Sequence, residues 1–359
     1  MCRHACPVFL ATKMDSNTPR GHALLLSRID EGCSEWTEDV IDKMYQCSQC
    51  GLCREICEFH WEEDTLVQVA REKIVGIGRE PEIVKDIAKL FIGKGTAYTK
   101  QKKKLKFEKD FIRDRKADVL YFAGNTAIYE QPEIIEATAA ILNSIDEDWT
   151  MLSNEGTAGV ELYELGYIDK AKEAARSLAE KIVDINPSIL ITGCAHAYRA
   201  FKELYPQWGI KRLNNLKIYH ITEYILKKIG DGNLELKRNS NLSNLSYHDP
   251  CQLGRRMGIY DAPRCLIEHV TGKKPIELFH NRNEAECCGA GSVMYLTHPN
   301  ISSKVAERRI NNALEEGAEI LVTACPNCKN IFTKTNSNMR NNIKMIDIAE
   351  LIASHIRKT

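Results

Sequence analysis

The sequence predicts a fold of the α+β and α/β classes, in which an all-helical N-terminal domain precedes two tandem α/β repeats. Three observations support this prediction. Apolar residues recur at helical spacing through residues 1–95, short strand-like runs alternate with helical segments from residue 117 onward, and this second part repeats its own pattern. Alternating strands and helices are typical of parallel sheets. We therefore expect a helical domain at 1–95, a linker at 96–116, and repeats at 117–240 and 241–359.

The cysteine content is the most informative feature of the composition. The chain has 359 residues with 49 basic and 49 acidic side chains, and 14 of its residues are cysteines. A net charge of zero indicates no nucleic-acid partner, and the sequence contains neither a signal-peptide pattern nor an apolar run of about 20 residues. We therefore expect a cytoplasmic protein, able to dock peripherally on a membrane complex, whose clustered cysteines serve metal or redox chemistry.

The predicted helical domain contains the first cysteine group. Its helices are expected at 20–29, 37–46, 65–78 and 80–95. Thr37 is the expected N-cap of the second helix. Residues 47–57 read C-x2-C-x2-C-x3-C, a spacing with which three thiolates hold three corners of an iron–sulfur cube. Structural zinc favours two separated pairs of ligands, so the spacing indicates an all-helical, ferredoxin-like iron–sulfur domain.

Two cubane clusters of unequal ligation are expected here. The fourth cysteine of such a run usually binds the neighbouring cluster, which assigns Cys57 to a second cubane and leaves Cys6 to complete the first. The opening stretch MCRHACP reads like the end of a second motif, so we expect two further ligands upstream of Met1. Only Cys2 and Cys57 then remain for the second cubane, with Cys33 as a substitute. The predicted ligands of the first cubane are Cys6, Cys47, Cys50 and Cys53.

A basic run follows this domain. Residues 99–117 read TKQKKKLKFEKDFIRDRKA, and such a charge pattern is typical of a solvated linker. Docking of an acidic partner is the alternative function of this segment.

The last part of the chain contains the second cysteine group. Thirty-five residues separate Cys251 from Cys287, and thirty-five separate Gly289 from Cys325. Strand-like runs, one of them at 276–280, precede the three motifs, so the motifs are expected at the ends of parallel strands. The five cysteines of this group are Cys251, Cys287, Cys288, Cys325 and Cys328.

Five thiols exceed what one zinc ion or one cubane uses. Neighbouring residues such as Cys287 and Cys288 are too close for an ordinary disulfide, but they can hold two irons of an opened-out [4Fe–4S] assembly. A zinc ion on four of the thiols and a cubane with a spare thiol are the alternatives. We expect Cys265 in a helix core. His248 and Asp249 are expected to cap the loop before the first cysteine, with a catalytic role as the alternative.

The first repeat keeps the same frame without most of the sulfur. Its residues at the five cysteine positions are Asn125, Thr157, Ala158, Cys194 and Ala197. It is therefore not expected to bind a cluster alone. Cys194 and His196 are expected to be structural or pocket-lining residues rather than ligands.

These motifs resemble the cysteine-rich CCG domain of heterodisulfide reductase catalytic subunits. The resemblance rests on the C-x35-C-C-G-x35-C-x2-C spacing and on the stretches HDPC, ECCGAG and TACPNCK. A two-cluster ferredoxin region followed by two CCG repeats resembles the fused form of that enzyme. The same layout occurs in the iron–sulfur subunits of glycolate oxidase and anaerobic glycerol-3-phosphate dehydrogenase. The resemblance covers nearly the whole chain.

The resemblance implies that the five C-terminal cysteines hold a noncubane [4Fe–4S] cluster, which cleaves a disulfide in two one-electron steps. It also implies that cubanes in the helical domain carry electrons to this cluster. The sequence departs from the family pattern in its incomplete first repeat, in its two missing N-terminal ligands, and in Glu58, which stands where a proline follows Cys57 in the pattern. One catalytic cluster of this kind is therefore implied instead of two.

The favoured function is that of an iron–sulfur oxidoreductase subunit that ends in thiol/disulfide reduction of the heterodisulfide type. One alternative is an electron conduit for a flavin-dependent 2-hydroxy acid or glycerol-3-phosphate dehydrogenase, and another is a redox-inert zinc-binding module. Neither a G-x-G-x-x-G turn after a strand nor a Walker loop appears, so no FAD or NAD site is expected. The expected partners are a flavoprotein or other electron-transfer subunit, a membrane-bound quinone or cytochrome, and a small thiol or disulfide substrate.

Overall fold

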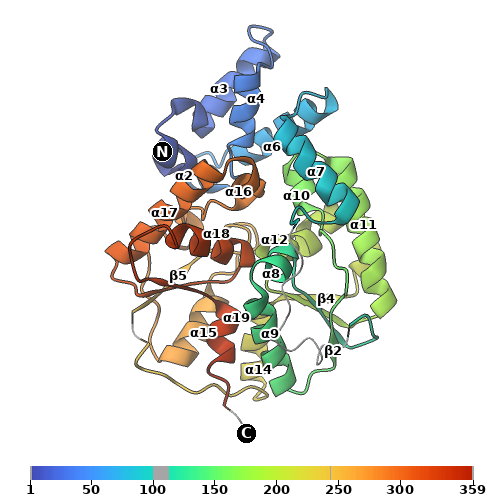
Figure 1. Ribbon diagram of the computed structural model, residues 1–359, viewed down its shortest axis with the longest axis vertical. Helices are drawn as coiled ribbons and strands as arrows, with labels where there is room; N and C mark the ends of the chain where they lie inside the picture. The colour runs from blue at the N-terminus through green and yellow to red at the C-terminus, as the bar shows by residue number, and fades with distance from the viewer. Residues whose placement is uncertain (1, 100–112, 243, 358–359) are drawn as a thin grey trace.

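The computed structural model describes residues 2–99, 113–242 and 244–357. Most of the basic run, for which we expected a linker, lies outside the described residues. Figure 1 shows the helical N-terminal region at the top and the two sheet-containing parts below it. None of the described helices is long and apolar enough to cross a lipid bilayer.

The N-terminal region is all helical, as the sequence predicts. Its helices are α1 Cys2–Ala5, α2 Pro7–Thr12, η1 Asp15–Asn17, α3 Pro19–Asp30, α4 Glu38–Tyr45, α5 Leu52–Ile56, α6 Glu63–Gly76 and α7 Glu82–Lys94. Thr18 and Thr37 cap α3 and α4, because their side chains accept hydrogen bonds from the N–H groups of Gly21 and Val40. Gly95 ends α7 in the left-handed conformation, at φ 70°.

The first repeat contains, within the described residues, a parallel four-stranded sheet in the order β2-β1-β3-β4. Its strands are β1 Val119–Phe122, β2 Trp149–Thr150, β3 Ile189–Thr192 and β4 Lys217–His220. Its helices are α8 Asn125–Tyr129, α9 Pro132–Ser144, α10 Val160–Glu164, α11 Ile168–Ile185, α12 Ala195–Arg199, the π-helix η2 Ala200–Leu204, α13 Tyr205–Gln207, η3 Lys211–Leu213 and α14 Ile221–Gly230. Strand β1 is buried along its whole length, as expected for a sheet covered on both faces.

The second repeat contains a parallel sheet in the order β5-β6-β7. Its strands are β5 Leu245–His248, β6 Ile320–Thr323 and β7 Lys344–Asp347. Its helices are α15 Asp261–Thr271, η4 Arg282–Glu284, η5 Gly291–Val293, α16 Met294–Thr297, α17 Pro299–Glu315, α18 Pro326–Asn336 and α19 Ile348–Ala353. The strand expected at 276–280 is wrong: only an isolated bridge from Ile276 to Ser246 forms there. Pro275 cannot donate a ladder hydrogen bond, and Phe279 is exposed to solvent, so the segment cannot form a regular strand.

The two repeats are built alike. In each repeat, the last two strands pair over four residues, and a helix begins directly after the last strand. Those helices, α14 and α19, both begin with a capping box, formed by His220 with Glu223 and by Asp347 with Glu350. Helix α9 packs against α19, and its counterpart α15 packs against α14. Each repeat thus receives the last helix of the other.

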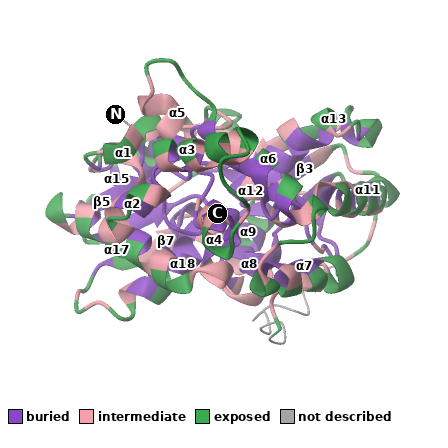
Figure 2. Cartoon of the chain, turned by 90° about the horizontal axis from the view of Figure 1, so that it is seen from above, coloured by how far each residue is buried: buried purple, intermediate pink, exposed green. Residues whose placement is uncertain are grey.

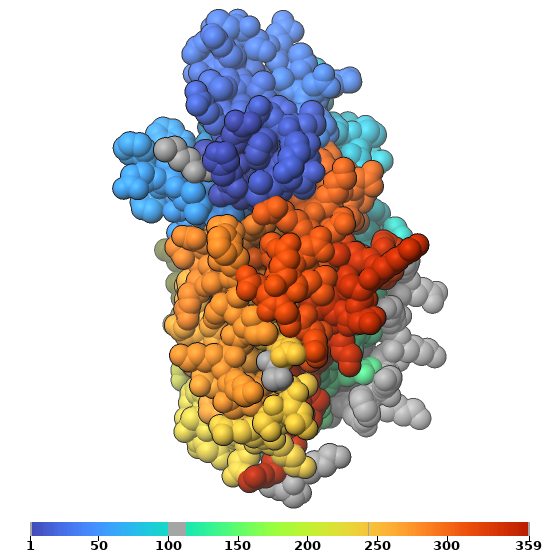
Figure 3. Space-filling model, turned by 90° about the vertical axis from the view of Figure 1, so that its left-hand side faces the viewer, coloured from blue at the N-terminus to red at the C-terminus, as the bar shows by residue number. Residues whose placement is uncertain are grey.

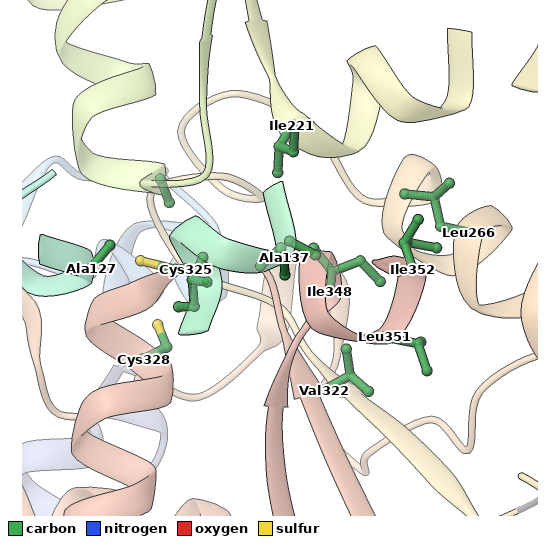
Figure 4. Close-up of a cluster of buried hydrophobic side chains, with 14 of the residues drawn as sticks. Ala127, Ala137, Ile221, Leu266, Val322, Cys325, Cys328, Ile348, Leu351 and Ile352 are labelled. Carbon is green, nitrogen blue, oxygen red and sulfur yellow. The ribbon is translucent and has the colours of Figure 1, made fainter. Parts of the chain in front are cut away.

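One hydrophobic core runs through both repeats. It includes Tyr121 of the first sheet and Tyr247 of the second, both fully buried. Figure 2 shows the buried residues gathered along the middle of the molecule, between exposed outer helices. Figure 4 shows Cys325 and Cys328 at the edge of this core, beside Ala127 of the first repeat. The core therefore fixes one cysteine motif against the opposite repeat.

The helical region is fixed against both repeats, and Figure 3 shows it seated directly on the second. The fully buried Arg71 of α6 donates to the carbonyl oxygen of Glu164 in the first repeat, at 2.7 Å. The backbones of Gly291 and Ser48 come so close that a Cβ atom on Gly291 would lie 2.3 Å from the Ser48 carbonyl oxygen. Only glycine fits this position without a shift of the neighbouring chain.

Candidate metal centres

The C-terminal cysteine group lies at the carboxyl edge of the β5-β6-β7 sheet. Cys251 follows β5, while Cys325 follows β6 as the N-cap of α18, whose first turn contains Cys328. Cys287 and Cys288 lie in the loop between η4 and η5. Because parallel strands end at one edge, motifs far apart in the sequence meet here. All five thiols are buried.

Hydrogen bonds join these five thiols into one set. Cys287 contacts Cys251 and Cys288, and Cys328 contacts both Cys288 and Cys325. Protons are shared unequally among them. Hydrogen bonds from Cys287 and Cys328 lower the pKa of Cys288 to about 5, whereas donation to Cys287 raises the pKa of Cys251. Since thiolates are the form that binds iron or zinc, the set is arranged to bind metal.

Backbone N–H groups add to this stabilisation of negative sulfur. Gly289 donates to the Cys287 sulfur at 3.3 Å, and Ala290 donates to the Cys288 sulfur at 3.4 Å. In the helical region, Gln49 donates to the sulfur of a predicted cubane ligand at 3.4 Å. Hydrogen bonds to sulfur are one of the means by which a protein tunes an iron–sulfur cluster.

His248 lies beside two of the five thiols. One of its ring nitrogens and the sulfurs of Cys288 and Cys328 lie within 4.8 Å of one another. Burial lowers the pKa of His248 to about 3, so the ring is neutral. Its Nδ1 accepts from Arg309 at 3.3 Å, and its Nε2 has no hydrogen-bond partner among the described residues. The His248 ring is therefore close enough to these thiols to share a metal ion with them.

The N-terminal group brings together the four cysteines of the predicted complete cubane. Cys6 precedes α2, and Cys47, Cys50 and Cys53 lie in the loop that leads into α5. All four line one small cavity. Burial raises the pKa of Cys47 to about 11 and raises those of Cys6 and Cys53 further. Bound cations reverse such shifts by displacing the protons, so a metal cluster fits this buried set of thiols.

The remaining cysteines of the helical region lie further out. Neither Cys2 nor Cys57 is among the described residues that line this cavity. Cys2 begins α1 and Cys57 ends α5, and these two helices pack against each other. Cys33 is exposed beyond the end of α3, with its thiol facing the carbonyl oxygen of Glu31. Cys33 thus lies in an exposed turn.

The two cysteine groups meet at Cys50 and Cys287, whose thiols share a hydrogen bond. Sequence reasoning missed this contact. Glycines of the CCGAG stretch approach protein backbone closely. Gly289 would place a Cβ atom 2.4 Å from the Ser302 carbonyl oxygen, and Gly291 has the equally close contact with Ser48. Gly289 therefore packs the loop within its own repeat, and Gly291 brings the two groups together.

Buried arginines surround both groups without ion-pair partners. Arg71 donates to the carbonyl oxygens of Met44 and Cys47, Arg255 donates to that of Cys50, and Arg309 is fully buried beside His248. None of the three forms an ion pair with a carboxylate in the described part of the chain. Buried charges need a counter-charge. Anionic clusters bound by thiolates would supply it, so the residues present fit iron–sulfur groups.

The first repeat contributes to the C-terminal group. The Cys194 thiol and the His196 ring both form hydrogen bonds with Cys325. Although burial lowers the pKa of His196, its contacts with Cys325 and Glu164 raise it to about 9. Both residues line a small cavity between the repeats, together with Asn327. This agrees with the pocket-lining role that the sequence favoured.

Two further expectations differ in outcome. Asp249 accepts two hydrogen bonds from Arg264, at 2.7 and 2.8 Å, and one from the backbone N–H of Arg282, so it acts as a loop cap. The expectation that Cys265 lies in the core is wrong, because this cysteine is exposed. The buried face of α15 is taken by Leu266 and its neighbours.

Comparisons with known proteins agree with this geometry. A cysteine-rich domain family named CCG matches residues 245–333, and a 4Fe-4S dicluster domain family matches residues 1–61. The chain is 30% identical over 323 residues to a subunit of the dihydromethanophenazine:CoB--CoM heterodisulfide reductase of Methanosarcina barkeri, a match that covers 88% of this chain and 78% of the relative. It is also 30% identical over 172 residues to the EtfAB:quinone oxidoreductase of Syntrophomonas wolfei, over 45% of this chain and 23% of that protein.

The fold also has a solved counterpart. A crystal structure of a hypothetical protein from Helicobacter pylori superimposes with a TM-score of 0.63 and 9% sequence identity, over 95% of this chain and 67% of that one. At this level of identity the likeness concerns the fold alone. The 4Fe-4S dicluster family covers the N-terminal cysteine group, and the cysteine-rich family covers the C-terminal one.

Proposed function

The chain belongs to the family of the heterodisulfide reductase subunit from Methanosarcina barkeri, and on this premise we propose that it catalyses thiol/disulfide conversion at its C-terminal cysteine group. Its role as an iron–sulfur oxidoreductase follows from the family and from the two matched domains. The proposal adds the end reaction, the ligands of each cluster and the route of the electrons.

The contact between Cys50 and Cys287 is the observation that carries the electron-transfer part of the proposal. It joins a ferredoxin-like cysteine group to a five-thiol group through a single hydrogen bond between two side chains. A chain that only bound structural metal would gain nothing from this junction. An electron-transfer protein would gain a short route between two redox centres.

The ligand assignment follows the two groups. We assign the cubane of the helical region to Cys6, Cys47, Cys50 and Cys53, and assign a noncubane [4Fe–4S] cluster to Cys251, Cys287, Cys288, Cys325 and Cys328. Cys2 and Cys57 are assigned to a second cubane, for which this sequence supplies only part of the ligands. When bound, such clusters supply or accept electrons one at a time.

Reduction of a disulfide needs two electrons and two protons, and it yields two thiols. The residues around Cys325 suit such a substrate. Cys194 and His196, which contact Cys325, line a small cavity together with Asn327, and we propose this cavity as the place where the substrate sulfur lies. His196 holds a proton there, since its pKa is raised to about 9 by Cys325 and Glu164 against the effect of burial.

Electron conduction without a thiol substrate is the second candidate function. The match to the EtfAB:quinone oxidoreductase of Syntrophomonas wolfei favours it, because the name of that protein specifies a quinone and no disulfide. In either function the chain needs an electron-transfer partner, which we propose to be a flavoprotein or another redox subunit. A membrane-bound quinone or cytochrome partner would place the chain peripherally on a membrane complex.

Metal analysis and spectroscopy of the anaerobically purified protein test the proposal. We expect a brown protein with about four to eight irons per chain and no zinc, and a paramagnetic signal that appears on oxidation in the presence of a thiol. Cys287→Ser should remove the thiol-dependent signal, whereas Cys265→Ser, which changes an exposed cysteine, should retain it. A colourless or zinc-containing protein would overturn the proposal. If the protein contains iron but its paramagnetic signal does not change with any thiol tested, electron conduction remains as the function.

A further inference from the structure

Arg255 occupies the junction of the two cysteine groups. It follows Cys251 in the loop after β5, and its side chain is only 8% exposed. Its Nε donates to the carbonyl oxygen of Cys50 at 2.9 Å. Its Nη1 donates to the carbonyl oxygens of Asn283 and Ala285, at 2.9 and 2.6 Å. One guanidinium thus holds the ferredoxin-like loop and the segment that leads into the adjacent cysteines.

The charge of this guanidinium has no carboxylate counterpart within the described ranges. Its Nη2 is buried without a hydrogen-bond partner there. Although burial lowers the pKa of Arg255, the thiols of Cys50, Cys251 and Cys287 raise it above its ordinary value. Sulfurs of both cysteine groups therefore act on the charge of this one guanidinium.

Neighbouring arginines differ from it in this respect. Arg256, the next residue, forms an ion pair with Asp64, and Arg264 forms ion pairs with Asp249 and Glu277. An unpaired buried guanidinium is costly in free energy, so the position of Arg255 requires anions that the protein part alone does not supply. Thiolate-bound clusters on both sides would be those anions.

We propose that Arg255 is the positioning residue that joins the two redox centres: its hydrogen bonds hold Cys50 and Cys287 in contact, and its single positive charge favours the reduced state of both centres. This inference rests on the proposed function, because it needs a cluster in each group. It extends that function by naming the residue that couples the two centres. A positive charge in a buried, low-dielectric site acts on every negative group around it.

Redox titration of the anaerobic, iron-loaded protein, followed by electron paramagnetic resonance, tests the charge. In Arg255→Gln we expect the reduction equilibrium of both centres to fall about tenfold, which corresponds to about 59 mV for a one-electron couple. Arg309→Gln is the matched control. Arg309 is also buried and has no ion-pair partner among the described residues, but it contacts His248 and the carbonyl oxygen of His280 on the C-terminal side alone. Its loss should leave the potential of the N-terminal centre unchanged.

Arg255→Lys tests the hydrogen bonds separately. Lysine keeps the charge but cannot hold three carbonyl oxygens in a planar fork, so both potentials should stay near those of the wild type while the spin–spin interaction between the centres weakens. If the spin–spin interaction in Arg255→Lys equals that of the wild type, the positioning role is refuted. This test holds even if Arg255→Gln fails to load iron. Full iron loading with unshifted potentials in Arg255→Gln, or a shift of both centres in Arg309→Gln, would refute the charge effect. Wild-type protein without iron would overturn the proposed function as well.

Discussion

Gly291→Ala should separate the two cysteine groups without removing any sulfur. An alanine Cβ at this position would lie 2.3 Å from the Ser48 carbonyl oxygen, and real Cβ atoms essentially never approach closer than 3.0 Å. The Ser48 backbone must therefore retreat by about 0.7 Å. Ser48 lies between Cys47 and Cys50, so this retreat pulls the ferredoxin-like loop away from Cys287. Forced overpacking of this kind costs about 1–3 kcal/mol.

Anaerobic thermal unfolding of the iron-loaded protein measures this cost, and the spin–spin interaction between the reduced centres measures the displacement. Gly93→Ala is the matched control, because Gly93 lies inside α7 with nothing within 4 Å of its added Cβ. Alanine there should stabilise the protein by about 0.5–1 kcal/mol. We expect the highest unfolding midpoint for Gly93→Ala, an intermediate one for the wild type and the lowest for Gly291→Ala. A Gly291→Ala protein with the wild-type midpoint and interaction would refute the reasoning.

Three further predictions concern burial and charge. Burial raises the pKa of Asp347 to about 8, far above its ordinary value, so the folded state keeps a proton that the unfolded chain releases, and stability should fall as pH rises from about 4 to about 8. Asparagine also caps helices well, so Asp347→Asn should flatten this fall when unfolding midpoints are measured across that range. An unchanged slope would contradict the prediction. Arg71→Met should destabilise the protein by at least about 3 kcal/mol, because several buried carbonyl oxygens lose their donor. The control is Arg20→Met, which changes an exposed arginine. Equal unfolding midpoints for the two variants would contradict the role of the buried hydrogen bonds. Alkylation followed by mass spectrometry should label Cys33 and Cys265 in the iron-loaded protein and reach the buried thiols only after iron is chelated; early labelling of the C-terminal group would show that its thiols are free.

Much of the architecture could be predicted from local patterns. Helical periodicity located α3, α4, α6 and α7, while Thr37 and Gly95 marked the start of α4 and the end of α7. The internal repeat predicted two parallel sheets, because strands that precede equivalent motifs must end at equivalent edges. The same argument brings together Cys251, Cys325 and Cys328, whereas Cys287 and Cys288 reach the group from a loop, because the strand expected before them does not form.

The parts that sequence reasoning missed depend on packing between distant segments. Nothing local to Cys50 or Cys287 indicates that their thiols meet, because that contact depends on how the helical region sits on the second repeat. The close approach of Gly291 to Ser48 could not be predicted for the same reason, since the two residues are remote in sequence. The exposed position of Cys265 was predicted wrongly, because the sequence of a helix of mixed polarity does not determine which of its faces is covered by neighbouring elements.

The central claim is that two iron–sulfur centres adjoin where Cys50 meets Cys287. Electron paramagnetic resonance of the fully reduced, anaerobic wild-type protein tests it most directly, because unpaired spins on adjoining clusters broaden and split each other's signals. We predict an interaction spectrum that collapses to the signal of one isolated centre when the C-terminal centre is removed by Cys287→Ser. A wild-type spectrum that is the plain sum of two independent centres, or that contains no cluster signal, would contradict the account.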